Sequence, residues 1–329
     1  MIKVAINGFG RIGRTAFKKL IERSSIEVVA LNDLTDPATL AHLLKYDSVH
    51  GGFKGTVSAT SNSLLVNGKT ITVYAEKDPS LLPWAKLGID VVIESTGRFT
   101  EAAKAEAHCK AGARKVIISA PATGNLKSIV IGVNDTILDG SEKVISNASC
   151  TTNNAAPMLK ILNENWIIES AQITTIHAYT GDQSLHDAPH KDLRRARAAA
   201  VSIIPTTTGA AKAITDIFPE LKGKIGGAGI RVPVISGSLT DITCILQKQT
   251  TPEELNAAFK KASETNLKGI LQYTEDPIVS VDIIGNTHSC IFDAQLTSVL
   301  GKMVKVFGWY DNEMGYSTRV AELVEKIGS

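Results

Sequence analysis

Apolar and polar positions in the first half of the chain follow two alternating patterns. Short runs rich in Val and Ile, bounded by Gly, Pro, Asn or Ser, occupy residues 3–7, 27–32, 90–95, 115–119, 128–133 and 143–146. Helical spacing of apolar side chains marks residues 14–23, 37–46 and 100–111. Continuous apolar strands that alternate with helices are typical of a buried parallel sheet wound from βαβ units.

Two local signals refine this pattern. Asp36 followed by Pro37 predicts a helix start, with the aspartate as N-cap and the proline at the first helical position. Residues 53–73 alternate more regularly around Asn67-Gly68, the turn pair of a tight hairpin. We therefore expect an antiparallel hairpin inserted into the parallel unit.

The pattern changes at about Cys150. Longer alternating strands are predicted for residues 172–179, 229–234, 238–247, 279–284, 294–299 and 303–310. Thr251 and Pro252 open a helix that runs to about Glu264, and residues 318–327 form a last helix. Consecutive strands with few helices between them favour a mixed or antiparallel sheet covered by helices.

The two halves together predict an α/β protein of two domains, which the length of 329 residues also favours. Residues 1–149 would form the parallel-sheet domain, and residues 150–314 an α+β domain around a mixed sheet. A C-terminal helix over about residues 315–329 would return to pack on the first domain.

A glycine-rich turn lies where the first predicted strand meets the first helix. Gly8, Gly10 and Gly13 match G-x-G-x-x-G, and Asp33 closes the second strand. Glycines let the backbone approach a pyrophosphate, helix N–H groups face it, and the carboxylate binds the ribose hydroxyls. A plain glycine turn beside a surface aspartate does not account for the complete spacing. We therefore predict a Rossmann-type domain that binds NAD, since a carboxylate at position 33 repels the 2′-phosphate of NADP.

A candidate nucleophile, Cys150, follows an apolar strand and begins a helical stretch that extends to about Asn165. A cysteine in the first turn of a helix meets free N–H groups and the positive end of the helix dipole, which favour the thiolate. Pro157 predicts either a kink or a helix that starts later.

A candidate base, His177, ends a run of alternating β-branched residues, from which an imidazole can reach a neighbouring helix N-terminus. The residues alone leave a catalytic and a structural role equally open for His177. Surface or hydrogen-bonded structural roles are the better interpretation for His42, His50, His108 and His288.

A cysteine nucleophile beside a dinucleotide site predicts aldehyde oxidation. The thiolate adds to the aldehyde, hydride leaves to the nicotinamide, and a thioester remains for an acceptor to release. His177 would hold Cys150 as a thiolate and then act as the base, so the two groups would titrate as a pair.

Composition limits the partners and the compartment. The formal net charge is +2, with basic residues spread among acids, so neither nucleic acid nor a membrane surface is indicated. No targeting segment precedes the first strand and no apolar stretch reaches ~20 residues, so we expect a cytoplasmic protein. The four cysteines form no Cys-x-x-Cys pair, which favours reduced thiols and no metal site. Cys109, Cys244 and Cys290 are interpreted as small buried hydrophobes.

Across essentially the whole chain, these motifs resemble the NAD-dependent, bacterial-type phosphorylating glyceraldehyde-3-phosphate dehydrogenases. The landmarks are residues 6–14 (INGFGRIGR), 45–48 (KYDS), 94–97 (ESTG), 148–153 (ASCTTN), 177–180 (HAYT), 205–212 (PTTTGAAK), 231–233 (RVP) and 309–313 (WYDNE). The resemblance implies reversible conversion of glyceraldehyde 3-phosphate and inorganic phosphate to 1,3-bisphosphoglycerate by a homotetramer.

The resemblance also implies roles for individual residues. Besides catalytic Cys150 and His177, it implies cofactor contacts at Arg11, Ile12, Asp33, Lys77, Ser119 and Asn312, with Asn312 near the nicotinamide amide. It places the attacking inorganic phosphate at Ser149, Thr151, Thr208 and Gly209, and the substrate anions at Thr180, Arg195 and Arg231. Hydroxyls, backbone N–H groups and arginines are the groups that phosphate sites need.

Three positions depart from the family pattern. Asn154 stands where a second cysteine is usual, which removes one route to a disulfide on oxidation. Residues 234–241 differ from the usual sequence after Arg231, for which we expect only a local change. Ala188-Pro189 stands where NAD-dependent members often have Leu-Pro and NADP-using relatives have Ala-Ser, whereas Leu34 after Asp33 resembles the NAD-dependent members. We therefore predict a preference for NAD that allows weak use of NADP.

Three other functions fit the sequence less well. An erythrose-4-phosphate dehydrogenase would release the thioester with water, but that group tends to lack Thr180 and the Thr208-Gly209 pair. A Cys/His hydrolase needs no dinucleotide fingerprint. A binding or structural protein derived from an inactive enzyme would not need intact Cys150, His177 and Arg231.

Overall fold

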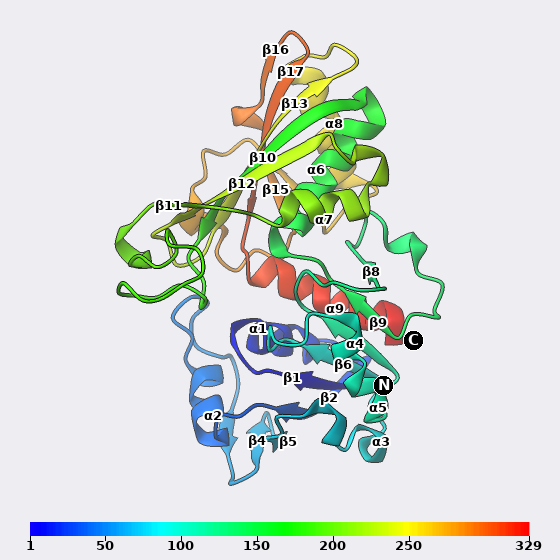
Figure 1. Cartoon of the computed structure of the whole chain (residues 1–329), viewed down its shortest axis with the longest axis vertical. Coiled ribbons are helices and arrows are strands. Elements are labelled where there is room, and N and C mark those ends of the chain that lie inside the picture. Colours follow the sequence, from blue (N-terminus) through cyan, green and yellow to red (C-terminus); the bar gives the residue numbers. More distant parts are fainter. Residues whose placement is uncertain (329) are drawn as a thin grey trace. The chain divides into compact units, whose positions relative to one another are not determined.

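The structure, a computed structural model, describes residues 1–328 and divides into two compact units (Figure 1). The first unit comprises Met1–Ile129, Thr136–Ala148 and residues 317–328. The second comprises Val130–Asp135 and Ser149–Tyr316.

The first unit is built on a nine-stranded sheet in the order β3-β4-β5-β2-β1-β6-β7-β9-β8. Its strands are β1 (Ile2–Asn7), β2 (Ile26–Asn32), β3 (Val57–Ala59), β4 (Ser63–Val66), β5 (Lys69–Tyr74), β6 (Val91–Glu94), β7 (Lys115–Ile118), β8 (Lys127–Ser128) and β9 (Val144–Ser146). Its helices are α1 (Arg11–Leu20), α2 (Pro37–Lys45), α3 (Trp84–Leu87), α4 (Ala102–Ala105), α5 (Ala107–Lys110) and most of α9 (Met314–Gly328).

The order of the parallel strands positions a crevice. Strand β1 pairs in parallel with β2 on one side and with β6 on the other, so the winding of the chain reverses at β1. Ligands of open parallel sheets bind beyond the carboxyl ends of the strands at such a reversal. The residues that end β1, β2 and β6 therefore lie at the predicted dinucleotide site.

The predicted hairpin is confirmed. Strands β4 and β5 are antiparallel, and the turn between them has positive φ at Asn67 (50°) and Gly68 (80°), as a type I′ turn requires. Strand β5 also pairs in parallel with β2. The hairpin therefore continues the main sheet at its edge.

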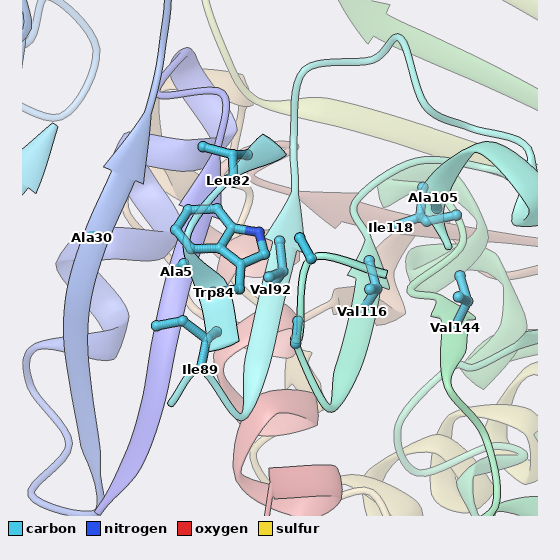
Figure 2. Close-up of a cluster of buried hydrophobic side chains, with 12 residues drawn as sticks. Ala5, Ala30, Leu82, Trp84, Ile89, Val92, Ala105, Val116, Ile118 and Val144 are labelled. Carbon is cyan, nitrogen blue, oxygen red and sulfur yellow. The ribbon is translucent and has the colours of Figure 1, made fainter. Parts of the chain in front are cut away.

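Apolar side chains fill one face of this sheet around Trp84, which is fully buried (Figure 2). Ala5, Val92 and Val116 reach the cluster from three parallel strands, and Ile89 from the segment before β6. The continuous apolar runs of the sequence are thus explained, because strands covered on both faces have no polar side.

Three predictions for the first unit need correction. The first helix begins at Arg11, three residues earlier than the apolar spacing indicated. The helix predicted for residues 100–111 is divided into two short helices at Glu106. The ψ angle of Glu106 is −15°, whereas ψ in a regular α-helix is about −42°. Of residues 128–133, only Ser128 pairs with the sheet. Beyond it, the side chains of Asn134 and Asp135 accept backbone N–H groups that a strand would have used.

The second unit has the predicted mixed sheet, in the order β11-β12-β10-β13-β17-β15-β14 with β16 paired to β17. Its strands are β10 (Ile168–Ala178), β11 (Ile204–Thr206), β12 (Ile225–Val232), β13 (Ser238–Leu246), β14 (Leu271–Thr274), β15 (Cys290–Asp293), β16 (Ser298–Leu300) and β17 (Met303–Tyr310). Its helices are α6 (Cys150–Trp166), α7 (Ala210–Ile217) and α8 (Pro252–Glu264). Helix α6 packs against β10, β13, β15 and β17 and against both other helices.

Helix α6 begins at Cys150, as the capping pattern predicted. The Ser149 hydroxyl is the N-cap and accepts the N–H of Thr152 at 3.0 Å. Pro157 lies inside the helix, so the alternative of a later start is wrong. Helix α8 begins with the predicted Thr251 cap, completed by Glu254 as a capping box.

One strand predicted for the second unit is wrong, and another is right only at its end. Residues Ser280–Ile283 form a short 3₁₀ helix, because the Asp282 carboxylate accepts the N–H of Val279 and closes a local turn. Of the strand predicted over residues 294–299, Ala294–Leu296 form another 3₁₀ helix and only Ser298 and Val299 lie in a strand, β16. Helix α7 and strands β11, β14 and β15 were not predicted.

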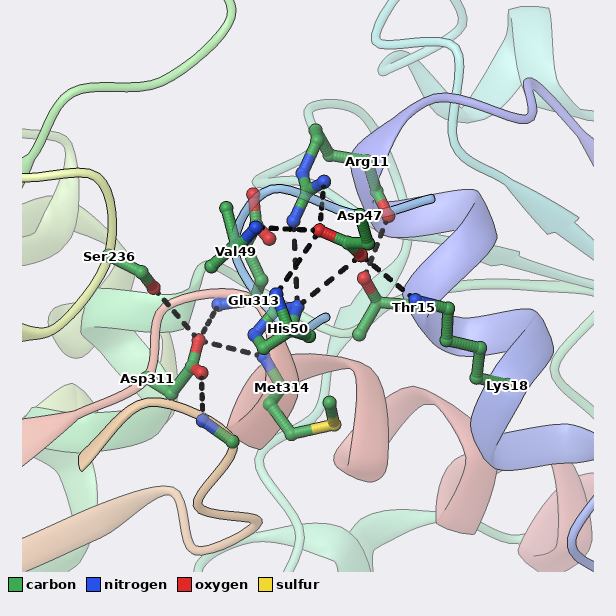
Figure 3. A network of polar contacts seen from close by, with 11 residues as sticks. Arg11, Thr15, Lys18, Asp47, Val49, His50, Ser236, Asp311, Glu313 and Met314 are labelled. Atoms are coloured by element: carbon green, nitrogen blue, oxygen red, sulfur yellow. Dashed lines mark hydrogen bonds and ion pairs between the residues drawn. The ribbon is translucent and has the colours of Figure 1, made fainter. Parts of the chain in front are cut away.

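A buried carboxylate holds the loop after α2 to helix α1 (Figure 3). The side chain of Asp47 is 2% exposed, and its carboxylate binds Arg11 Nη1 at 2.8 Å and Lys18 Nζ at 2.9 Å. Its Oδ1 also accepts the backbone N–H groups of Val49 and His50. Burial alone would raise the pKa of Asp47, but hydrogen bonds from His50, Lys18 and Arg11 hold it well below its usual range.

We predict that Asp47→Asn lowers the free energy of unfolding by about 3 kcal/mol at neutral pH, because two cations lose their buried partner. The depressed pKa makes this stabilisation full above the unfolded carboxyl pKa of about 3.9, and it declines as the pH falls further. Urea unfolding of both proteins at several pH values measures the difference, which should shrink on acidification. Glu101→Gln, which breaks the exposed pair with Lys104, is the control and should cost less than about 1 kcal/mol. An equal cost for both variants would contradict the argument.

Candidate functional site

A cavity of about 360 Å³ opens at the carboxyl ends of β1, β2 and β6 in the first unit. Four of the predicted cofactor residues line it: Gly8, Gly10, Asp33 and Lys77. The other lining residues are Asn7, Asn32, Leu34, Thr35, Glu76, Ser95, Thr96, Arg98 and Phe99.

The three glycines of the turn serve different purposes. Gly8 has φ +93°, and a Cβ there would meet the backbone of Ser95 and Thr96 below 3.0 Å. A Cβ at Gly13 would lie 2.1 Å from the carbonyl oxygen of Gly8. At Gly10, by contrast, a Cβ would meet nothing within 4 Å. Two glycines therefore allow the turn to form, and the third leaves open space where a phosphate group can approach the backbone.

Asp33 is fixed beside this turn. Its Oδ2 accepts the N–H of Phe9 at 2.7 Å, and its Oδ1 accepts the N–H of Thr35 at 2.9 Å. The carboxylate thus lies at the end of β2 on the cavity wall, where ribose hydroxyls can donate to it. The residues present fit a dinucleotide.

Other predicted cofactor residues do not line this cavity. Arg11 and Ile12 form the first turn of α1, and the Arg11 side chain is bound to Asp47. Ser119 follows β7 and donates its N–H to Glu94 O. Asn312 belongs to the second unit, where its Oδ1 accepts the Ser238 hydroxyl at 2.9 Å.

The second unit brings Cys150 and His177 together, although 27 positions separate them. Cys150 Sγ lies 3.4 Å from His177 Nε2, at the N-terminus of α6 and the end of β10. His177 Nδ1 lies 2.7 Å from the carbonyl oxygen of Ala178, and Arg231 Nη1 lies 2.8 Å from the same nitrogen. Cys150 is half-buried and His177 is 5% exposed.

Burial and Arg231 both act on the protonation of this pair. Burial raises the pKa of the Cys150 thiol, while Arg231 and the N–H groups of the first helical turn oppose that rise. Burial and then Arg231 lower the pKa of His177 to about 3. Burial therefore disfavours charge on both groups, whereas Arg231 favours the thiolate and disfavours the imidazolium.

Arg231 and Arg195 form a cluster with polar groups that the sequence analysis had only partly identified. Arg231 Nη1 lies 3.4 Å from Thr180 Oγ1, and Arg195 Nη1 lies 2.6 Å from Asp182 Oδ2. Thr180 also donates to Asp182. Asp182 was not predicted from the sequence. It could have been identified as an acidic residue two positions after Thr180 and before the basic run that contains Arg195.

The residues expected to bind inorganic phosphate lie at two helix starts. Ser149 and Thr151 flank Cys150, and the Thr151 hydroxyl lies 3.0 Å from the Tyr310 hydroxyl. Thr208 accepts the N–H of Ala210 at 3.2 Å, and Gly209 immediately precedes α7. Both sites present N–H groups of a first helical turn.

Within residues 1–328, neither the other cysteines nor the possible metal ligands form a second candidate site. All four cysteines are free; Cys244 and Cys290 are buried as predicted, whereas Cys109 is only partly so. Among residues 1–328, no group of three or more His, Cys, Asp or Glu side chains is arranged to hold a metal ion. No helix in that range is long and apolar enough to cross a membrane.

A Rossmann-type sheet with an acidic residue after its second strand, combined with a thiol–imidazole pair at a helix start, is typical of a nucleotide-dependent oxidoreductase. Comparison with known proteins identifies the family. Residues 2–102 match the NAD binding domain of glyceraldehyde 3-phosphate dehydrogenase, and residues 149–312 match its C-terminal domain.

Full-length relatives agree with these matches. The chain is 60% identical to glyceraldehyde-3-phosphate dehydrogenase of Thermotoga maritima, over 99% of each chain. It is 57% identical to the enzyme of Geobacillus stearothermophilus, over 100% of this chain and 98% of the relative. It is 56% identical to glyceraldehyde-3-phosphate dehydrogenase 2 of Streptomyces avermitilis, over 100% and 99%. The chain belongs to the glyceraldehyde-3-phosphate dehydrogenase family.

We predict that Asp33→Asn weakens NAD binding about tenfold, because the ribose hydroxyls lose a charged acceptor. Calorimetric titration of the variant with NAD measures the change. Asp36→Asn is the matched control, because asparagine caps a helix as well as aspartate does and Asp36 lies outside the cavity. Unchanged affinity in Asp33→Asn would remove this residue from the site.

We predict that Arg231→Gln slows alkylation of Cys150 by iodoacetamide about tenfold at neutral pH. Without the cation, burial raises the pKa of the thiol further, and less thiolate is present. Arg197→Gln, which breaks an exposed pair with Asp187, is the control and should react as the wild type does. Faster alkylation in Arg231→Gln would show that Arg231 does not favour the thiolate.

Proposed function

We propose that this chain oxidises glyceraldehyde 3-phosphate with NAD and transfers the acyl group from Cys150 to inorganic phosphate, which yields 1,3-bisphosphoglycerate. The observation that carries the proposal is the Cys150–His177 pair at the start of α6, beside Arg231. Membership of the family supports the overall reaction and the cofactor.

His177 would act as a base at each step. Arg231 Nη1 can only donate, and it lies 3.0 Å from the Ala178 carbonyl oxygen and 3.4 Å from Thr180 Oγ1. When its N–H groups are directed to those oxygens and Nδ1–H also donates to the Ala178 carbonyl, the lone pair of Nε2 faces the Cys150 thiol. Nε2 takes the thiol proton as sulfur bonds to the aldehyde carbon, and that proton passes to the new hydroxyl of the hemithioacetal. Nε2 then takes the hydroxyl proton as the carbon is oxidised, which leaves a thioester on Cys150. With its pKa lowered to about 3, the imidazole is neutral at physiological pH, but it is a weak base, so Nε2 would take each proton only as the bond at the substrate carbon forms or breaks.

The cofactor would bind through Gly8, Gly10, Gly13, Asp33 and Lys77, with Arg11, Ile12, Ser119 and Asn312 as further contacts. NAD supplies the acceptor for the hydride. The carboxylate of Asp33 supports a preference for NAD, with weak use of NADP, because a 2′-phosphate would meet a like charge there.

Two groups of residues would hold the anions. Arg195, Arg231 and Thr180 would bind the phosphate of the substrate, since they supply two guanidinium groups and a hydroxyl. Ser149, Thr151, Thr208 and Gly209 would bind the attacking phosphate. There the side chains of Ser149 and Thr151 are engaged within the fold, so N–H groups at the starts of α6 and α7 support this role. The phosphate oxygen would displace the Cys150 sulfur, which regains a proton.

The resemblance further supports a homotetramer in the cytoplasm. Sedimentation of the purified chain would test the tetramer, and fractionation of cells would test the compartment.

The decisive experiment measures NADH formation from glyceraldehyde 3-phosphate, with and without inorganic phosphate. We predict phosphate-dependent NADH formation and its loss, by at least ~10³-fold, in Cys150→Ser, because a serine hydroxyl is a far weaker nucleophile at neutral pH. Cys109→Ser is the matched control, since the Cys109 thiol lies in the first unit, 3.9 Å from the carbonyl oxygen of Lys143, and it should retain full activity.

The same assay separates the alternatives. NADH formation that does not respond to phosphate would indicate release of the thioester by water, as in an erythrose-4-phosphate dehydrogenase. A fully active Cys150→Ser variant would refute covalent catalysis by this thiol.

A further inference from the structure

A row of buried polar side chains crosses the carboxyl ends of three parallel strands in the first unit. Asn7 at the end of β1 is in register with Asn32 at the end of β2 and with Glu94 at the end of β6. Their exposures are 1%, 5% and 2%. The proposed reaction at the Cys150 thiol gives none of these three residues a role.

Each hydrogen bond in this row has a fixed donor and acceptor. At the β2 end, the backbone of Glu76 determines which atoms of Asn32 donate and accept. Glu76 donates its N–H to Asn32 Oδ1 at 2.8 Å, and its carbonyl accepts from Asn32 Nδ2 at 2.9 Å. Only one orientation of the amide satisfies both bonds. Asn32 Nδ2 then donates to Asn7 Oδ1 at 2.7 Å, which leaves Asn7 Nδ2 to donate to Glu94 Oε2 at 2.5 Å.

The opposite end of the row is set by Trp84. An indole N–H can only donate, and Trp84 Nε1 lies 3.0 Å from His108 Nδ1. Nδ1 must therefore accept, so the proton of the neutral imidazole is on Nε2, which lies 3.0 Å from Glu94 Oε2. Asn7 Nδ2 lies 3.3 Å from the same Nε2, and the two donors share Glu94 Oε2 as their acceptor. Trp84 and His108 are both fully buried, and the apolar cluster around Trp84 holds the indole in place (Figure 2).

Donors from both sides therefore converge on the Glu94 carboxylate. Its Oε2 accepts from Asn7 and His108, and its Oε1 accepts the N–H of Thr96 at 2.9 Å. Asn7 and Thr96 line the cavity of the first unit, whereas His108 does not. Glu94 thus connects the cavity residues Asn7 and Thr96 to His108, whose imidazole lies outside the cavity and would not touch the ligand.

We propose that His108 is a positioning residue for nucleotide binding: by donating from Nε2 to Glu94, it holds Asn7 and Thr96 in the geometry that the bound dinucleotide requires. This proposal rests on the proposed NAD site. The sequence predicts a surface or hydrogen-bonded structural role for His108; the contacts with Trp84 and Glu94 agree with the hydrogen-bonded role and connect it to the cavity. A site that is already formed before the ligand arrives spends less binding energy on ordering its walls.

The test compares two substitutions of the same residue. His108→Gln keeps an acceptor for the Trp84 N–H and a donor for Glu94, whereas His108→Leu keeps neither. Calorimetric titration of the full chain with NAD should show binding within about twofold of wild type for His108→Gln, and about tenfold weaker for His108→Leu. Equal affinities for the two variants would overturn the proposal.

A purely structural role is separated by a destabilising control. Val116→Ala removes apolar contacts from the cluster that holds Trp84 but leaves every bond of the polar row in place. It should lower the melting temperature and leave the affinity for NAD unchanged; a loss equal to that of His108→Leu would overturn the proposal. If His108→Leu does not fold, His108→Met replaces it, because this flexible apolar side chain also lacks a donor for Glu94, and binding as tight as wild type would then overturn the proposal. Wild-type protein that binds no NAD would instead refute the proposed cofactor site.

Discussion

A buried polar group must find a hydrogen-bond partner, and both candidate sites of this chain are organised by that requirement. In the first unit, Asn7, Asn32 and Glu94 end parallel strands with little access to water, so they bind one another across the sheet. In the second unit, His177 is enclosed between Cys150 and Arg231. Each arrangement fixes the orientation of groups that a ligand or substrate would meet, which is the physical basis of a preformed site.

The same burial controls the chemistry of the thiol. Low exposure disfavours charge on Cys150 and on His177, and Arg231 acts in opposite directions on the two groups. A cation nearby favours a thiolate and disfavours an imidazolium. The pair is therefore suited to a proton transfer that accompanies attack on the aldehyde. An ion pair that persists before substrate arrives would need a further source of stabilisation.

Much of the fold followed from local pattern. The parallel strands, the hairpin at Asn67-Gly68, the Asp36 and Thr251 caps and the start of α6 after Ser149 all depend on neighbours in sequence. Failures occurred where side chains bonded to nearby backbone, as at Asp282 and Asn134, so that apolar runs did not become strands. Periodicity cannot register such competition, because it counts apolar positions and ignores which polar group satisfies each N–H.

For the sites, residue types and spacing were enough to select Gly8, Gly10, Asp33 and Cys150 as candidates, whereas the choice of a catalytic role for His177 also needed the family resemblance. The sequence by itself determined the glycine turn, the capped helix and the strand-end histidine, since each depends on a few adjacent residues. Only the tertiary structure decided that Cys150 and His177 meet, that Arg231 lies against the imidazole, and that Trp84 sets the proton of His108. These contacts join residues far apart in the chain, and the register of strands and the packing of helices, which bring them together, are properties of the whole fold.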